Sequence, residues 1–175
     1  MITAHPIGRI RTAYRDRADT PVQTAVNVDE LGTVELEPPY RDGLEGLDGF
    51  ECAWLLTWMT PDADDRAPVE MRQTPFLLTG TGREMGLFAM RGPRRPNPIG
   101  LHLVRIVSVR DDGFTFAGVD MLDGTPLLDV KPWVAPADVP TGRTVAPPVR
   151  CGWFDDVSFD RGQTPRSLLD EPGEG

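Results

Sequence analysis

LHLVRIVSVRDDGFTFAGV, residues 101–119, contains two runs of strand-forming residues separated by a turn. Branched and aromatic side chains recur through residues 101–110 and again through residues 113–119, as they do in β-strands. Asp111-Asp112-Gly113 between them is a turn signal, because aspartate and glycine tolerate the backbone angles of a tight turn. The stretch therefore predicts an antiparallel hairpin.

Five other segments have the pattern of short strands. Residues 52–59 are nearly all apolar, which is typical of a central buried strand, and residues 33–37 alternate apolar and charged side chains. Further strands are expected at 6–12, 86–91 and 127–130, and a short helix at 40–50. Short strands separated by Pro and Gly, with little helix, predict a mainly β fold: a small single-sheet β-barrel with short helices and long loops.

The composition indicates one soluble globular domain. The chain has 175 residues, 39% hydrophobic and 26% charged, enough for one core and too few for two. No apolar run reaches the roughly 20 residues that span a bilayer, and the start lacks a signal-peptide pattern, so no membrane partner is expected. The two cysteines, Cys52 and Cys151, lie far apart, which argues against a disulfide framework and favours a cytoplasmic location.

Charge is unevenly distributed along the chain. The net charge is −9, and arginine supplies every positive side chain except Lys131. Residues 83–110 hold six arginines and one acid, so this segment carries +5 and the remainder −14. A local basic segment in an acidic protein suits a local anionic ligand better than a long phosphate backbone. A GC-rich genome would explain arginine in place of lysine, but not the clustering.

Several common site types are excluded by their patterns. Gly80-Thr-Gly82-Arg-Glu-Met-Gly86 has the wrong spacing for a dinucleotide loop and is interpreted as a flexible surface loop. The only histidines, His5 and His102, stand in no nucleophile motif with serine or cysteine. No His or Cys spacing suggests a metal site.

Two segments carry the functional signal. In residues 88–101, prolines restrict the backbone around Asn97 and neighbouring arginines, which predicts a rigid loop for a carboxylate, phosphate or nucleotide edge. The alternative, a structural turn with solvated arginines, has equal weight on physical grounds. Residues 118–133 hold three aspartates and the only lysine around a turn at 123–126. Here the alternative is a hairpin turn with a surface pair between Asp129 and Lys131.

Together these segments resemble the TsaA-like (TrmO) family, through RPNPIGL at 95–101 and DMLDGTPLLDVKP at 120–132. The similarity extends in order to residues 7–11, 20–23, 44–50, 54–56 and 149–153. The expected organisation is a TsaA-like domain over residues 1–154, followed by a C-terminal tail over 155–175. This tail holds six acids and two arginines and is expected to be mobile.

The resemblance implies a homodimer that binds S-adenosylmethionine near the subunit interface and N6-methylates threonylcarbamoyladenosine next to the tRNA anticodon. By matching motifs, the implied cofactor-binding residues are Gln23, Thr24, Ala25, Met59, Thr60, Arg91, His102, Gly118, Val119, Asp120 and Met121. Candidate substrate-binding residues are Arg94, Arg95 and Asn97. Asp123 is the candidate catalytic proton acceptor, with Lys131 as an electrostatic aid, and each also has a purely structural alternative.

The chain departs from the family pattern on the acceptor side. Cys52 stands where the family usually has His, and Ala-Met-Arg-Gly-Pro-Arg at 89–94 replaces Ala-Thr-Arg-Ser-Pro-His. Three hypotheses are open. The favoured one is a tRNA methyltransferase; the others are a small-molecule methyltransferase with a changed acceptor and a non-catalytic S-adenosylmethionine-binding protein.

Overall fold

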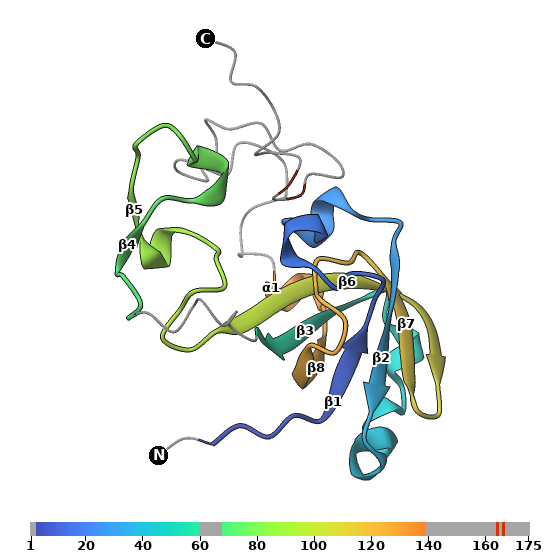
Figure 1. Cartoon of the computed structure of the whole chain (residues 1–175). Helices are drawn as coiled ribbons and strands as arrows, with labels where there is room; N and C mark the ends of the chain where they lie inside the picture. The colour runs from blue at the N-terminus through green and yellow to red at the C-terminus, as the bar shows by residue number, and fades with distance from the viewer. Residues whose placement is uncertain (1–2, 60–67, 139–163, 165, 167–175) are drawn as a thin grey trace.

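A computed structural model of the chain describes residues 3–59, 68–138, 164 and 166, and it is mainly β (Figure 1). Six strands close into an antiparallel barrel in the order β1-β2-β7-β6-β3-β8. The bounds are β1 Gly8–Arg11, β2 Leu31–Leu36, β3 Cys52–Trp58, β6 Ile99–Arg110, β7 Gly113–Ala117 and β8 Pro126–Pro132. The predicted fold class is confirmed.

The hairpin predicted at residues 101–119 is present. β6 and β7 pair antiparallel from Arg105↔Ala117 to Arg110↔Gly113, with an irregularity between Ile106 and Ser108. β3 lies between β6 and β8, which confirms that it is a central strand. Its burial alternates, because Ala53, Leu55 and Thr57 point into the barrel while the residues between them are half-buried on the outside.

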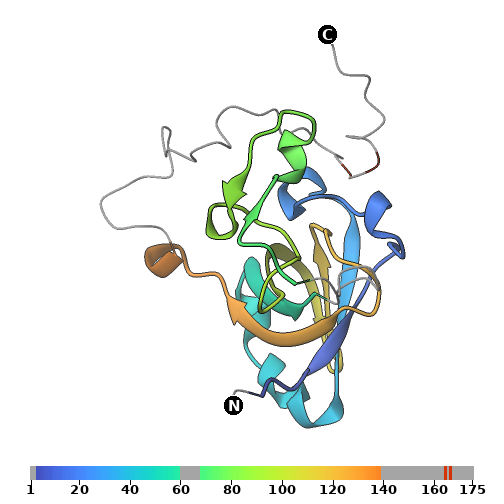
Figure 2. The same ribbon diagram turned by 60° about the vertical axis from the view of Figure 1, so that its left-hand side comes forward.

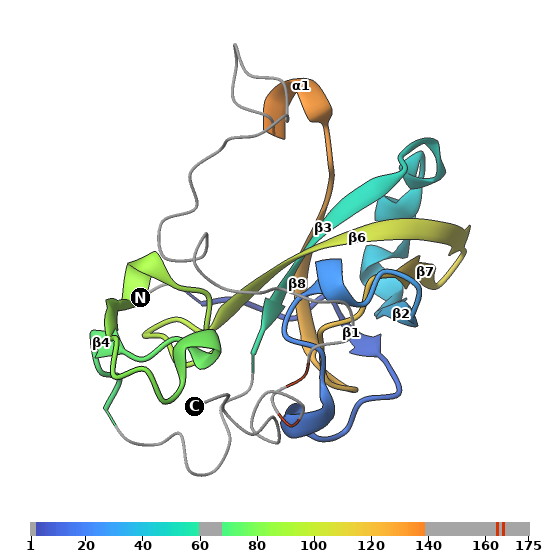
Figure 3. The ribbon, with the colours of Figure 1, turned by 90° about the horizontal axis from the view of Figure 1, so that it is seen from above.

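Residues 68–98 form a lobe beside the barrel, which is green in Figures 1 and 2. It contains the two-residue strands β4 Arg72–Gln73 and β5 Met85–Gly86, and the 3-10 turns η6 Phe76–Leu78 and η7 Leu87–Ala89. Seen from above in Figure 3, the lobe lies at one end of β6, and the turn to β7 lies at the other.

The strand predicted over residues 86–91 is wrong. Only Met85 and Gly86 pair with another strand, and the chain then turns through η7. Leu87 is buried, whereas Phe88 and Ala89 are both exposed, so the run does not alternate between two faces. An apolar run alone does not make a strand when no neighbouring strand is present to share its hydrogen bonds.

The remaining described helices are short. They are η1 Arg17–Asp19, η2 Thr24–Val26, η3 Pro38–Leu44, η4 Leu47–Gly49 and α1 Ala135–Asp138. α1 lies at the end of the segment that leaves β8, away from the barrel in Figures 2 and 3. The helix expected at 40–50 is thus two 3-10 turns, which bury Leu44 and Leu47 against the core. None of the helices in the described residues is long and apolar enough to cross a membrane.

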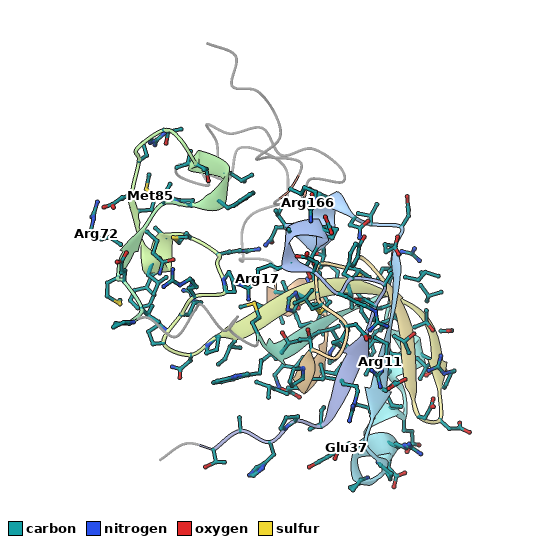
Figure 4. All side chains as sticks on the ribbon, viewed as in Figure 1. Arg11, Arg17, Glu37, Arg72, Met85 and Arg166 are labelled. Carbon is teal, nitrogen blue, oxygen red and sulfur yellow. The ribbon has the colours of Figure 1, made fainter. Side chains whose placement is uncertain are left out.

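The C-terminal tail is described at only two positions. Arg166 forms ion pairs with Asp16 and Asp19 beside η1, where Figure 4 shows it close to Arg17. Every other residue of 155–175 except Thr164 lies outside the described residues, so the predicted mobility of this segment stays a prediction.

The core fills the barrel with aliphatic side chains around two aromatic rings. Phe114 and Phe116 of β7 are fully buried and meet edge to face, with ring centroids 6.4 Å apart and planes at 62°. Ile10, Val34 and Leu55 reach them from β1, β2 and β3, all at 0% exposure. This continuous apolar interior identifies the barrel as the stable part of the chain.

Closure of the barrel leaves no room for a side chain at Gly8. A Cβ there would lie 2.1 Å from the backbone oxygen of Glu35 on β2. We expect Gly8→Ala to lower the free energy of unfolding by about 1–3 kcal/mol, as overpacking does, when measured by urea denaturation. Gly43→Ala is the matched control, because a Cβ at Gly43 meets nothing within 4 Å. Equal stability of the two variants would contradict the close approach of β1 and β2.

Candidate functional site

A polar cluster inside the barrel is centred on His102 of β6. Its Nδ1 lies 2.7 Å from Oδ1 of Asp120, and its Nε2 lies 2.9 Å from Oγ1 of Thr57. Because a carboxylate only accepts, Nδ1 donates to Asp120; in the neutral ring, Nε2 then accepts from the Thr57 hydroxyl. The side chains of His102 and Asp120 are each 7% exposed, and Thr57 is fully buried. Both ring nitrogens of His102 are therefore used inside the protein.

Asp120 joins this cluster to the early loop that carries η2. Its Oδ2 accepts the backbone N–H of Thr24 at 3.1 Å. Gly118, just before it, has φ of 97°, a value that favours glycine, and a Cβ there would lie 3.6 Å from Cβ of Thr24. Asn27 donates from Nδ2 to the Val119 carbonyl at 2.8 Å. Polar contacts thus hold the loop against the segment that follows β7.

Gly100 allows the bond between Thr57 and His102 to form. A Cβ at this position would lie 2.3 Å from Oγ1 of Thr57 and 2.4 Å from Nε2 of His102. Thr57 was not among the predicted site residues, although it is the only hydroxyl in the apolar run 52–58. A polar side chain in a buried strand needs a hydrogen-bond partner, and this need is the sequence signal that could have identified Thr57.

Arg91 connects the lobe to the same loop. Its Nη1 donates to Oε1 of Gln23 at 3.2 Å, and Gln23 is the residue that precedes η2. Arg91 is exposed, so a positive charge stands at the edge of the cluster. Figure 4 shows the rest of the lobe, marked by Arg72 and Met85, extending away from the barrel that carries Arg11.

Six of the predicted cofactor residues thus meet in one region, from four separate stretches of the chain. They are Gln23, Thr24, Arg91, His102, Gly118 and Asp120. Val119 and Met121 belong to the core beneath this region, at 0% and 3% exposure, and Ala25 is exposed on η2. The region combines backbone groups, one carboxylate and one guanidinium above an apolar floor.

The end of β3 is fastened to the proline-rich loop. The N–H of Met59 donates to the carbonyl of Pro98 at 2.7 Å, while Thr60 lies outside the described residues. A cavity of about 200 Å³ opens between this strand end and the loop. Its lining residues are Trp58, Val69, Pro93, Arg94, Arg95, Pro96 and Pro98.

The three candidate substrate residues have different surroundings. Arg94 and Asn97 are exposed, and Arg94 lines the cavity. Arg95 is half-buried, and its Nη1 donates to the carbonyls of Leu87 at 3.3 Å and Met90 at 3.0 Å. The guanidinium of Arg95 therefore stabilises the loop, whereas Arg94 is exposed at the cavity.

The structure does not bring Asp123 and Lys131 together. Asp123 lies in the turn before β8, with guanidinium nitrogens of Arg11 and Arg15 at 3.9 Å, and Lys131 lies near the far end of that strand. The surface pair of Lys131 with Asp129 is present at 2.8 Å and raises the pKa of Lys131, which keeps the amine charged. The proposed catalytic roles of Asp123 and Lys131 stay predictions.

Burial changes the acidity of two side chains near the barrel. It raises the pKa of the Cys52 thiol, with Glu51 adding to the effect, so Cys52 is a weak nucleophile. It also raises the pKa of Tyr14, whose oxygen accepts a hydrogen bond from Asn27 at 3.2 Å. Cys52 is a free thiol, and Cys151 lies outside the described residues. Within the part of the chain that the structure describes, no three side chains of the metal-ligating types come together.

The matching motifs and the barrel agree with a comparison to known families. The model of the tRNA-methyltransferase O N-terminal domain matches residues 9–139. The chain belongs to this family. The matched range contains all six strands of the barrel except the first residue of β1, together with the whole lobe.

Known relatives of the chain include proteins from archaea, bacteria and mammals. A probable S-adenosyl-L-methionine-binding protein of Pyrococcus abyssi is 36% identical over 155 residues, covering 89% of this chain and 77% of that protein. A mouse tRNA (adenine(37)-N6)-methyltransferase is 30% identical over 148 residues, 82% of this chain and 33% of the mouse protein. The crystal structure of TrmO from Pseudomonas aeruginosa superposes with a TM-score of 0.63 at 32% identity, covering 85% of this chain and 64% of that one.

Two substitutions of His102 separate its two hydrogen bonds. In His102→Asn the side-chain amide takes the place of Nδ1, so the hydrogen bond to Asp120 is kept and the one to Thr57 is lost. In His102→Gln the longer amide reaches Thr57, and the hydrogen bond to Asp120 is lost. Because Asp120 holds the Thr24 amide, we expect that amide to exchange its hydrogen at the wild-type rate in His102→Asn and about tenfold or more faster in His102→Gln. NMR-detected exchange measures this. A role in packing alone predicts the reverse order, since Gln is closer to His in volume.

Proposed function

We propose that this protein transfers a methyl group from S-adenosylmethionine to N6 of threonylcarbamoyladenosine next to the anticodon of tRNA. Its family membership makes it an S-adenosylmethionine-dependent methyltransferase. The observation that carries the proposal is that the residues implied by the family resemblance, at 23–24, 91 and 118–120, converge in one region although they are far apart in the sequence.

The residues of this region fit the proposed cofactor chemically. Arg91 is exposed and offers a cation for the carboxylate of the methionine part. The negative charge of Asp120 lies in the same region and suits a sulfonium. When bound, S-adenosylmethionine supplies an electrophilic methyl group.

The contribution of the chain is to hold the reacting groups in place. Methyl transfer to an N–H acceptor needs an in-line approach, exclusion of water and removal of one proton. The hydrogen bonds of Asp120 and Gln23 limit the motion of the loop that would meet the cofactor. Asp123 stays our candidate for the proton acceptor, since its carboxylate is 18% exposed and Asp123 follows Asp120 by three residues.

Charge supports an RNA acceptor. The basic segment 83–110 includes Arg91 and Arg94 beside the region, while the rest of the chain is acidic. A local basic segment of this kind suits the few phosphates of an RNA loop rather than a long phosphate backbone. The acidic remainder and the changed residues Met90 and Gly92 support the second candidate, a methyltransferase for a small molecule.

A methyl-transfer assay distinguishes these acceptors. The purified chain is incubated with methyl-labelled S-adenosylmethionine and with tRNA that carries or lacks threonylcarbamoyladenosine. We expect label in the modified tRNA alone, at N6 of the adenine, as determined by mass spectrometry of the nucleosides. Label in a small metabolite with both tRNAs inert would support the second candidate. Binding of S-adenosylmethionine without methyl transfer to any acceptor would indicate a non-catalytic S-adenosylmethionine-binding protein.

A homodimer is part of this proposal. The outer face of the barrel presents Trp54, Leu56 and Trp58 of β3, which pair with Leu103, Leu101 and Ile99 of β6. The three β6 side chains are 37%, 57% and 46% exposed. An uncharged apolar patch can match a second copy of itself about a twofold axis. Trp58 also lines the cavity next to the proline-rich loop, so this patch continues into that cavity.

Sedimentation tests the dimer directly. Leu101 is the most exposed of these β6 residues, and a charge in the middle of an apolar interface is unfavourable on both copies at once. We expect Leu101→Asp to sediment as a monomer at concentrations where the wild type is a dimer. Val28→Asp places the same charge on an exposed apolar position outside the patch and serves as the control. A dimer that persists in Leu101→Asp would place the interface elsewhere.

A further inference from the structure

Phe88 is the most exposed large apolar side chain in the described part of the protein. It is 79% exposed, whereas the next, Leu101, is 57% exposed. It lies on η7 of the lobe. Single exposed apolar side chains are common, so exposure alone assigns no partner to Phe88; the backbone and the charges around the ring decide what it can bind.

The backbone on both sides of Phe88 is held firmly. Leu87 is buried at 1% exposure, and its N–H donates to the carbonyl of Met71 at 2.9 Å. The guanidinium of Arg95 bonds the carbonyl of Leu87 on one side and that of Met90 on the other. The ring is therefore presented on a fixed turn, which lowers the entropy lost when a partner stacks on it.

The surroundings of Phe88 are positively charged. Residues 68–98 contain five arginines and two acids, so the lobe carries +3 and the rest of the chain −12. Arg91 follows Phe88 by three residues and bonds Gln23 beside the candidate cofactor site. A contact between the lobes of two copies would bring two positive surfaces together, which is unfavourable. A negatively charged partner with flat apolar faces fits both features.

We propose that Phe88 is a stacking platform for an unpaired base of the acceptor RNA, with the arginines of the lobe meeting the adjacent phosphates. The inference rests on the proposed function, in which the acceptor is an RNA loop. Aromatic side chains set in a basic surface bind unstacked bases through their π-faces, and the phosphates supply the charge. The bond from Arg91 to Gln23 places this platform next to the region where the methyl group would be transferred.

Three variants test the stacking. Phe88→Leu keeps an apolar side chain but has no π-face, and Phe88→Trp keeps the π-face. Phe50→Leu is the control, because Phe50 is an aromatic residue that is 40% exposed and lies just before β3, outside the lobe. The probe is an anticodon stem-loop that carries threonylcarbamoyladenosine. We expect Phe88→Leu to raise KM for this RNA about tenfold, since stacking on one base contributes roughly 5- to 150-fold in affinity. Phe88→Trp and Phe50→Leu should keep the wild-type KM.

Two further measurements distinguish a stacking platform from other roles of Phe88. The Kd for S-adenosylmethionine, measured by calorimetry, should be the same in all variants, because Phe88 does not touch the cofactor region. Arg94→Ala should reduce the slope of log KM against log salt by about one, which is the signature of a lost phosphate contact.

Several results would overturn the proposal. A wild-type KM in Phe88→Leu would show that no base stacks there, while the methyltransferase function would stand. A changed sedimentation coefficient in Phe88→Leu would show that a second copy covers the ring. A wild-type protein that binds S-adenosylmethionine but neither binds nor methylates the RNA would refute the proposed acceptor itself, and the platform with it.

Discussion

Closure of the barrel between β1 and β8 is the constraint on which the rest of the structure depends. The pairing is short, with Gly8 opposite Leu127 and Arg9 opposite Pro126. The segment just before β8 continues the contact, because the N–H of Gly124 donates to the carbonyl of Ile10 at 2.8 Å. Without these bonds the sheet would have two free edges, and the segments after β1 and after β7 would be held together only through the pairing of β2 with β7.

The site is a consequence of this closure. The chain after β1 runs through Tyr14 to the early loop, and the carbonyl of Tyr14 accepts the N–H of Asp123 at 2.7 Å. The Asp120 carboxylate accepts the backbone N–H of Thr24 in that loop. His102 and Thr57 extend this line of hydrogen bonds from β6 to the neighbouring strand β3. A fully paired polar line inside an apolar barrel specifies one arrangement, because any slip would leave a buried group without a partner.

Stability and recognition are divided between the two parts of the chain. The barrel buries Phe114, Phe116 and their aliphatic neighbours, and its interior leaves little freedom. The lobe exposes arginines and Phe88 on turns that other residues hold in place. Three of the four departures from the family pattern, at Met90, Gly92 and Arg94, fall in the lobe, and the fourth, Cys52, lies on β3. Changes on exposed turns can alter recognition while the barrel core is kept.

The sequence by itself determined most of the barrel strands and the family. Alternation in residues 33–37, the turn at 111–113 and the apolar run at 52–59 are local patterns, and local patterns report strands that have partners. The same reasoning failed at 86–91, since only Gly86 of that run has a neighbouring strand to pair with. Tertiary structure alone decided that Arg95 supports its own loop while Arg94 is exposed. It also decided that Asp123 and Lys131 lie at opposite ends of β8. It also revealed Thr57. Hydrogen bonds between residues that are 18 to 96 positions apart depend on how the barrel closes, and that information is not contained in any single stretch of the chain.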